Sequence, residues 1–221
     1  ADVVLFDRLV SAEILSLASP GAELIDVGKR PGGSHTQDLI NDLLVSVARS
    51  GRRVVRLKGG DPFIFGRGGE EVEVLARHGI ECGVVPGISS ALAGPAAAGI
   101  PVTHRTVARA VTIITGHEAA SSDPVNWRAA AELGGTLIVL MGVERRTDIV
   151  ERLRSGGLSE HTPVAVVMHA TTPQQRVWSG DLLGLADAAL ESPAVIVIGA
   201  VARFADHAAQ LVAAHTLPSH D

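Results

Sequence analysis

Residues 54–71 read VVRLKGGDPFIFGRGGEE and give the strongest structural signal in the sequence. Its apolar start predicts a strand, the periodic residues 70–78 predict a helix, and a glycine-rich turn joins them. Gly59 and Gly60 let a ligand approach the backbone, while Asp61 supplies an acceptor and Pro62 restricts the turn. The phosphate-loop order and the dinucleotide fingerprint are both absent. The turn therefore suits a small polar cofactor, with a plain strand-to-helix connection as the alternative.

The same alternation of strands and helices extends in both directions along the chain. Apolar runs predict strands at 3–6, 23–27, 83–85, 111–115, 136–141, 164–168 and 195–201, and a short antiparallel strand at 176–179. Helical spacing predicts helices at 11–17, 37–50, 89–98, 125–133, 147–155, 182–190 and 204–215. This pattern is typical of an α/β protein with mostly parallel sheets. Residues 99–105 interrupt it, so we expect an N-terminal domain over 1–106 and a C-terminal domain over 107–221.

Four further places lie at the ends of predicted strands, where ligands of α/β folds bind. Residues 85–91 form a second strand-to-helix turn, in which Ser89 or Ser90 caps the helix or contacts a ligand. Met141 lies at the end of a strand of the second half, where core packing is the ordinary role of a methionine. Asp7-Arg8 and Gly28-Lys29-Arg30 lie at the ends of two strands that we expect to be neighbours. The carboxylate of Asp7 and the ammonium of Lys29 would then form either a structural ion pair or an acid–base pair.

The composition excludes several classes of function. The chain has 221 residues, of which 46% are hydrophobic and 19% are charged, and this composition is typical of a soluble globular protein. Four Phe, two Trp and no Tyr leave few platforms for stacking nucleic-acid bases. The single cysteine, Cys82, and the absence of a His-Glu-x-x-His pattern argue against a disulfide or a metal site and favour the cytoplasm. The sequence contains no apolar run long enough to span a membrane.

Taken together, these motifs resemble the tetrapyrrole methylase family, and within it the enzymes that methylate uroporphyrinogen III. The resemblance runs from Asp2 to about Phe204, and its segments are residues 7–11, 27–30, 54–71, 84–90, 99–105, 115–117, 140–142 and 175–176. It implies two α/β domains that hold S-adenosylmethionine in a cleft between them. It also implies a homodimer that methylates C2 and C7 of uroporphyrinogen III. The product would be precorrin-2, formed via precorrin-1, for siroheme or cobalamin synthesis.

The resemblance also implies roles for individual residues. Asp7 would accept a proton and Lys29 would donate one. The cofactor contacts of the family correspond here to Gly59, Gly60, Asp61, Ile64, Ser89, Ser90, Met141 and Ala170. Because the substrate carries eight carboxylates and arginine binds carboxylates with two parallel hydrogen bonds, we expect substrate contacts from the motif arginines. These are Arg8, Arg30, Arg67 and Arg105. His104 and His117 are either macrocycle contacts or structural histidines.

The sequence departs from the family pattern in three places. We expect a strand and a Gly-x-Gly-Pro-Gly-Asp loop to precede Ala1. The loop 31–36 is about one residue shorter than in the family, and Ala170 stands where some members have glycine. The alternatives are a methylase of a later corrin precursor, a distant member acting on ribosomal RNA or a protein side chain, and a catalytically silent binding module. The motifs at Asp7 and Lys29 favour the uroporphyrinogen enzyme.

Overall fold

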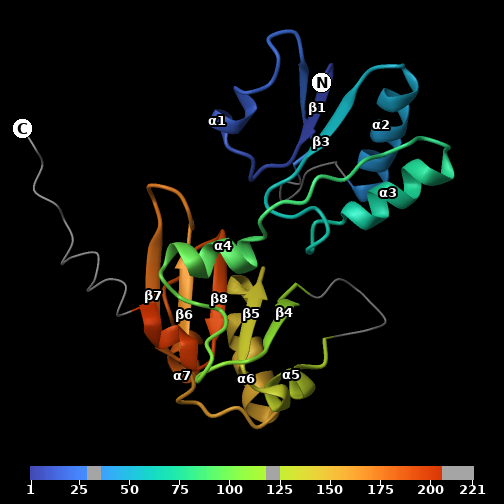
Figure 1. Cartoon of the computed structure of the whole chain (residues 1–221). Helices are drawn as coiled ribbons and strands as arrows, with labels where there is room; N and C mark the ends of the chain where they lie inside the picture. Colours follow the sequence, from blue (N-terminus) through green and yellow to red (C-terminus); the bar gives the residue numbers. More distant parts are fainter. Residues whose placement is uncertain (29–35, 118–124, 206–221) are drawn as a thin grey trace, which may run out of the picture. The chain divides into compact units, whose positions relative to one another are not determined.

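The structure is a computed structural model that describes residues 1–28, 36–117 and 125–205 (Figure 1). The chain divides into two compact units, Ala1–Ser89 and Ser90–Asp221. In the part of the chain that the structure describes, each unit contains one β-sheet. Among the described residues, none of the helices is long and apolar enough to cross a membrane. The chain passes from the first unit to the second between Ser89 and Ser90. The sequence predicts a domain boundary near residue 107, and that boundary stays a prediction.

The first unit is built on a parallel three-stranded sheet in the order β2-β1-β3. Its strands are β1 (Val3–Phe6), β2 (Glu23–Asp26) and β3 (Val54–Leu57). Its helices are α1 (Ala12–Leu15), α2 (Gln37–Arg49) and α3 (Gly68–Arg77). The buried side chains Leu5, Ile40 and Leu75 join β1, α2 and α3 in one core. Parallel pairing brings the carboxyl ends of all three strands to the same edge of the sheet.

Local signals in the sequence set the ends of these helices. The Ser11 hydroxyl accepts a hydrogen bond from the N–H of Ile14, and Thr36 caps α2 in the same way through Leu39. After α2 and α3 the chain reverses at Gly51 and Gly79, whose φ angles are 77° and 69°. Glycine tolerates this left-handed conformation, so both helices end where the sequence predicts.

The expected strand at residues 83–85 is wrong. These residues are described, but they join no strand in the described part of the chain, and Val85 is exposed. A strand requires a hydrogen-bonded neighbour as well as an apolar run, and periodicity does not report that neighbour.

The second unit is built on a five-stranded sheet in the order β4-β5-β8-β6-β7. Its strands are β4 (Val111–Thr115), β5 (Thr136–Leu140), β6 (Pro163–Met168), β7 (Arg176–Asp181) and β8 (Ala194–Ile198). β4 and β5 are parallel, whereas β8 runs antiparallel to both of its neighbours and β7 forms an antiparallel pair with β6. The expectation of mostly parallel sheets therefore holds for the first sheet, and the second sheet is mixed.

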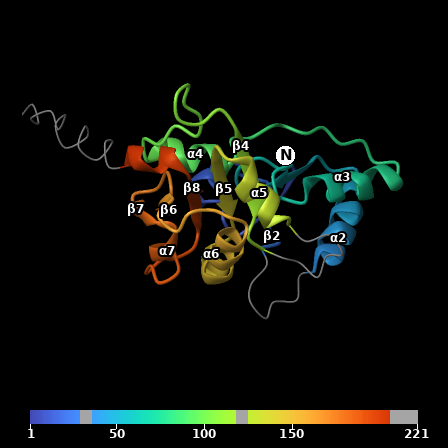
Figure 2. The same cartoon turned by 90° about the horizontal axis from the view of Figure 1, so that it is seen from below.

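Helices cover both faces of this second sheet. They are α4 (Ser90–Ala97), α5 (Trp127–Leu133), α6 (Arg146–Ser155) and α7 (Leu182–Leu185), with 3₁₀ turns η1 (Val143–Arg145) and η2 (Ala200–Arg203). Alternate strand residues divide the core: Ile138 and Val197 pack in the cluster of α4, whereas Val139 and Ile196 pack in the cluster of α5, α6 and α7. Figure 2 shows α4 on one side of the strands and α6 and α7 on the other.

Candidate functional site

The predicted proton acceptor lies at the carboxyl edge of the first sheet. Asp7 directly follows β1, and the two neighbouring strands end beside it, as the sequence predicts. Gly28 allows the segment after β2 to lie against the backbone of Arg8, because a methyl group on Gly28 would lie 2.7 Å from the Arg8 amide nitrogen. Lys29, the predicted proton donor, and Arg30 lie outside the described residues.

Two cations contact the Asp7 carboxylate. Arg56 donates from Nη2 to Oδ1 over 2.5 Å, and Lys58 Nζ lies 3.6 Å from Oδ2. The side chain of Asp7 is 32% exposed, whereas those of Arg56 and Lys58 are 13% and 8% exposed. Solvent and ligands therefore reach the carboxylate, while both cations lie behind it in the protein.

The same two cations contact a second carboxylate, Glu71 on α3. Arg56 Nε donates to Glu71 Oε1 at 3.1 Å, and Lys58 Nζ lies 3.1 Å from Oε2. Gln37 of α2 donates to the same carboxylate at 3.2 Å. With its side chain 5% exposed, Glu71 is the most deeply buried of the four charged groups. We call Asp7, Arg56, Lys58 and Glu71 the charged cluster.

Sequence reasoning missed most of this cluster. It assigned no role to Arg56, Lys58 or Glu71. One signal was available, because Gly68, Glu71 and Leu75 share a helical face and all three are buried. A carboxylate on such a face needs a buried partner.

The glycine turn after β3 is fixed by the carboxylate of Asp61. Oδ1 accepts a hydrogen bond from the Phe63 amide at 2.9 Å, and Oδ2 accepts one from the Gly87 amide at 3.1 Å. The two glycine-rich turns of the first unit are therefore joined. They approach so closely that a methyl group on Gly87 would lie 2.2 Å from the Gly60 carbonyl oxygen. Asp61 thus organises this backbone, and its predicted contact with the cofactor stays a prediction.

The other predicted cofactor residues of the first unit differ in accessibility. Gly59 and Gly60 are exposed, and Gly60 adopts a left-handed φ of 78°. Ile64 is exposed, whereas Ser89 is buried. Bare backbone and three exposed apolar side chains are therefore open to a ligand at this turn: Phe63, Ile64 and Phe65.

The predicted substrate arginines also differ in how accessible they are to a ligand. Arg67 is engaged by its neighbour, since its Nε donates to Glu70 Oε1 at 2.9 Å. Hydrogen bonding to Glu70 also raises the pKa of Arg67, so the guanidinium stays charged. Arg8 and Arg105 are exposed. Among the predicted substrate arginines that the structure describes, these two are therefore exposed, whereas the guanidinium of Arg67 is held by Glu70.

Two predicted cofactor residues of the second unit, Met141 and Ala170, lie at the carboxyl ends of β5 and β6. Met141 follows β5 with a left-handed φ of 54° and is 52% exposed, so it is not core packing. Ala170 follows β6 between His169 and Thr171, whose φ angles are 47° and 66°. Because β5 and β6 are both antiparallel to β8, these two loops lie at the same edge of the sheet. Ser90 begins α4 and is exposed.

Close backbone contacts hold both loops. A methyl group on Gly116 would lie 2.5 Å from the Gly142 Cα, so the loops after β4 and β5 touch. Gln175 fixes the loop after β6, because its side chain accepts from the Thr171 amide at 2.7 Å and donates to the Ala97 carbonyl at 3.0 Å. Left-handed backbone at residues other than glycine is costly and concentrates at functional sites.

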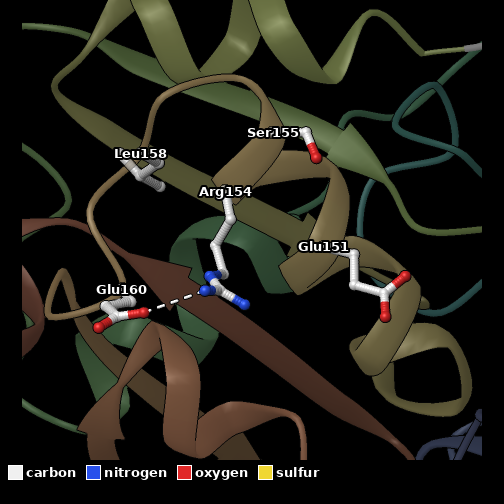
Figure 3. A pocket seen from close by; sticks show the side chains of 5 residues that line it. All are labelled: Glu151, Arg154, Ser155, Leu158 and Glu160. Carbon is white, nitrogen blue, oxygen red and sulfur yellow. Dashed lines mark hydrogen bonds and ion pairs between the residues drawn. The ribbon is translucent and has the colours of Figure 1, made fainter.

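Two surface pockets lie elsewhere. One of about 570 Å³ is lined by residues of α6 and the segment after it, including Arg154, which donates to Glu160 at 3.1 Å (Figure 3). A second, of about 510 Å³, is lined by residues near the start of β6 and the end of β7. Both include residues that precede or begin β6, the opposite end of that strand from Ala170, and neither contains a predicted site residue. Within the described ranges no group of His, Cys, Asp and Glu is arranged to hold a metal ion.

Comparison with known proteins gives consistent matches. The family model described as tetrapyrrole (corrin/porphyrin) methylases matches residues 1–186. A siroheme synthase of Neisseria meningitidis serogroup C is 51% identical over 204 residues, covering 91% of this chain and 42% of the relative. The chain thus spans less than half the length of the curated relatives it matches.

Two solved structures extend the match to the fold. The uroporphyrin-III C-methyltransferase from Thermus thermophilus, complexed with S-adenosylhomocysteine, has a TM-score of 0.81 and 41% identity and covers 92% of this chain and 87% of its own. A cobalt-precorrin-4 methyltransferase has a TM-score of 0.79 and 28% identity and covers 91% of this chain and 85% of its own.

Proposed function

Because the chain belongs to the tetrapyrrole methylase family, we propose that it transfers methyl groups from S-adenosylmethionine to C2 and C7 of uroporphyrinogen III. The product is precorrin-2, formed via precorrin-1. The observation that carries this proposal is the similarity, over most of both chains, to a uroporphyrin-III C-methyltransferase that holds S-adenosylhomocysteine. The similarity to siroheme synthases supports siroheme as the end product.

The described residues fit a sulfonium nucleoside. Exposed backbone at Gly59 and Gly60 offers amide and carbonyl groups to the polar parts of the cofactor, and Ile64 offers apolar surface to its base. Met141 and Ala170 occupy loops whose left-handed backbone leaves few alternative conformations. When bound, S-adenosylmethionine supplies an electrophilic methyl group. The chain itself has to hold the macrocycle carbon in line with that methyl group.

The partly exposed carboxylate of Asp7 supports a role in proton transfer. A pyrrole carbon of the reduced macrocycle is already electron-rich, so the protein mainly manages the protons of the ring. The Asp7 carboxylate is accessible and its cations lie behind it, so its orientation is fixed before substrate binds. In this proposal Asp7 accepts the proton and Lys29 donates one.

Arginines select the substrate by its carboxylates. Arg8 and Arg105 are exposed, and each can bind one carboxylate with two parallel hydrogen bonds. Arg67 contributes after exchanging Glu70 for a substrate carboxylate, and Arg30 completes the set. We also propose a homodimer in the cytoplasm, in keeping with the exposed free thiol of Cys82.

The test uses the full-length protein with S-adenosylmethionine and uroporphyrinogen III. We expect S-adenosylhomocysteine to form only when the tetrapyrrole is present, and the tetrapyrrole to gain the mass of two CH2 groups, because each incoming methyl group replaces a proton. In Asp7→Asn, turnover should fall at least about 100-fold, the usual contribution of a general base, while calorimetry finds unchanged cofactor affinity.

Other results would favour the alternatives. Cofactor binding without methyl transfer would indicate a silent binding module. Transfer to a later corrin precursor, with none to uroporphyrinogen III, would indicate the activity named for the cobalt-precorrin-4 enzyme. Equal loss of turnover and cofactor affinity in Asp7→Asn would make Asp7 structural.

A further inference from the structure

The charged cluster is balanced and mostly buried. It consists of two carboxylates, Asp7 and Glu71, and two cations, Arg56 and Lys58, and each cation contacts both carboxylates. Taking four charges out of water is costly, and well-packed apolar side chains usually stabilise a protein as well as a buried ion pair does. A gain in the stability of the fold therefore does not explain why these four charged groups lie together. Asp7 is the most exposed member of the cluster.

The guanidinium of Arg56 is fixed at all three nitrogens. Nε donates to Glu71 at 3.1 Å, Nη1 donates to the Leu57 carbonyl at 3.1 Å, and Nη2 donates to Asp7 at 2.5 Å. Because the guanidinium is planar, holding the Nε end on Glu71 sets the direction of the Nη2 end. Lys58 has no such plane, and the contact of its Nζ with both Glu71 oxygens places its charge.

We propose that Glu71 is a positioning residue that holds Arg56 and Lys58 against the Asp7 carboxylate and compensates one of their two charges. Glu71 does not touch the substrate. It keeps Asp7 in one orientation, and it prevents two uncompensated cations from turning Asp7 into a poor proton acceptor. This inference rests on the proposed function, in which Asp7 accepts the proton.

The charge balance predicts opposite effects for two substitutions. Glu71→Gln leaves Asp7 facing both cations, so the acid limb of the pH profile of kcat/KM should move about one unit lower. Turnover on the plateau should fall about tenfold, because a weaker base accepts the proton less readily. Lys58→Met removes one cation, so the acid limb should move about one unit higher.

Other groups near Asp7 are the same in all variants. On β2, Asp26 pairs in register with Phe6 of β1, and its Oδ1 accepts from the Gly28 amide at 2.8 Å. Arg56 is retained in every variant. Shifts of opposite sign therefore report the cluster, because a structural defect would not raise the limb in one variant and lower it in the other.

The experiment measures kcat, KM and S-adenosylmethionine affinity against pH in the full-length protein. The double variant Lys58→Met/Glu71→Gln removes one charge of each sign, so its limb should return to within about 0.3 units of wild type. Glu23→Gln is the matched control: it removes a carboxylate from an exposed ion pair with Arg52 in the same unit and should leave the limb unchanged.

The outcomes separate this inference from the proposed function. If the wild type methylates uroporphyrinogen III and the limb shifts in the same direction, or not at all, in both single variants, the inference is wrong and the function stands. If Glu71→Gln does not fold, an unmoved limb in Lys58→Met overturns the inference. A wild type without methyl transfer overturns the function and, with it, the role of Glu71.

Discussion

Replacing Gly87 with alanine should separate the two glycine-rich turns of the first unit. The new methyl group would lie 2.2 Å from the Gly60 carbonyl oxygen and 2.9 Å from its carbon. Ordinary contact begins at 3.4 Å, so the backbone has to retreat by more than 1 Å. A flexible side chain could move aside, but both contacts are with backbone.

The magnitude follows from two contributions. Overpacking of this kind costs about 1–3 kcal/mol. Retreat of the turn also lengthens the hydrogen bond from the Gly87 amide to Asp61, now 3.1 Å, and a bond to a charged acceptor contributes about 1.5–3 kcal/mol. Because the exposed loop relaxes, we expect Gly87→Ala to lower the free energy of unfolding by about 2 kcal/mol. We also expect S-adenosylmethionine affinity to fall at least about tenfold, since displacement of Gly60 moves its predicted ligand contacts.

The assay is urea denaturation followed by far-ultraviolet circular dichroism, together with calorimetric titration of the cofactor. Fluorescence is unsuitable, because both tryptophans, Trp127 and Trp178, lie in the second unit. Gly83→Ala is the matched control, since a methyl group there meets nothing within 4 Å. If Gly87→Ala keeps wild-type stability and cofactor affinity, the close approach of the two turns is refuted. If Gly83→Ala loses as much as Gly87→Ala, the loss does not come from the contact between Gly87 and Gly60.

Two further predictions concern the second unit. The amide of Gly184 donates to Asp181 and holds the pKa of that carboxyl below its usual range. The stabilisation is therefore present above about pH 4 and is lost as the pH falls through the folded pKa. Asp181→Asn should unfold in less urea than wild type at pH 7, and the gap should close toward pH 3; a constant gap would contradict the assignment. Gly116→Ala should lower the free energy of unfolding by about 1–3 kcal/mol, because its methyl group meets the Gly142 Cα at 2.5 Å, and urea denaturation at wild-type values would show that the loops are apart.

Local pattern predicted most individual elements. The bounds of β1, β3 and β4 agree with the apolar runs, because a short run flanked by turn residues carries its own limits. The antiparallel strand after β6 was also predicted, and Arg176 begins it. The order of the strands in the second sheet could not be predicted from the sequence pattern. The insertion of β8 between β5 and β6 depends on contacts distant in sequence, and periodicity does not encode strand order.

The candidate site shows the same limit. That Asp7 and the glycine turn share one edge follows from parallel strands, so sequence reasoning found it. The link from Asp61 to Gly87 was not predicted, because the residues are 26 positions apart and the bond depends on how two loops meet. Glu71 was missed because a glutamate in the first turn of a helix ordinarily faces solvent and favours the positive end of the helix dipole.

The most direct test of the proposed function is the position of the transferred methyl groups. Full-length protein should be incubated with uroporphyrinogen III and S-adenosylmethionine labelled with ¹³C in its methyl group, and the tetrapyrrole examined by ¹³C magnetic resonance. The proposal predicts two labelled methyl groups, bonded to C2 and C7. A tetrapyrrole without label, or with label on other positions, would contradict it.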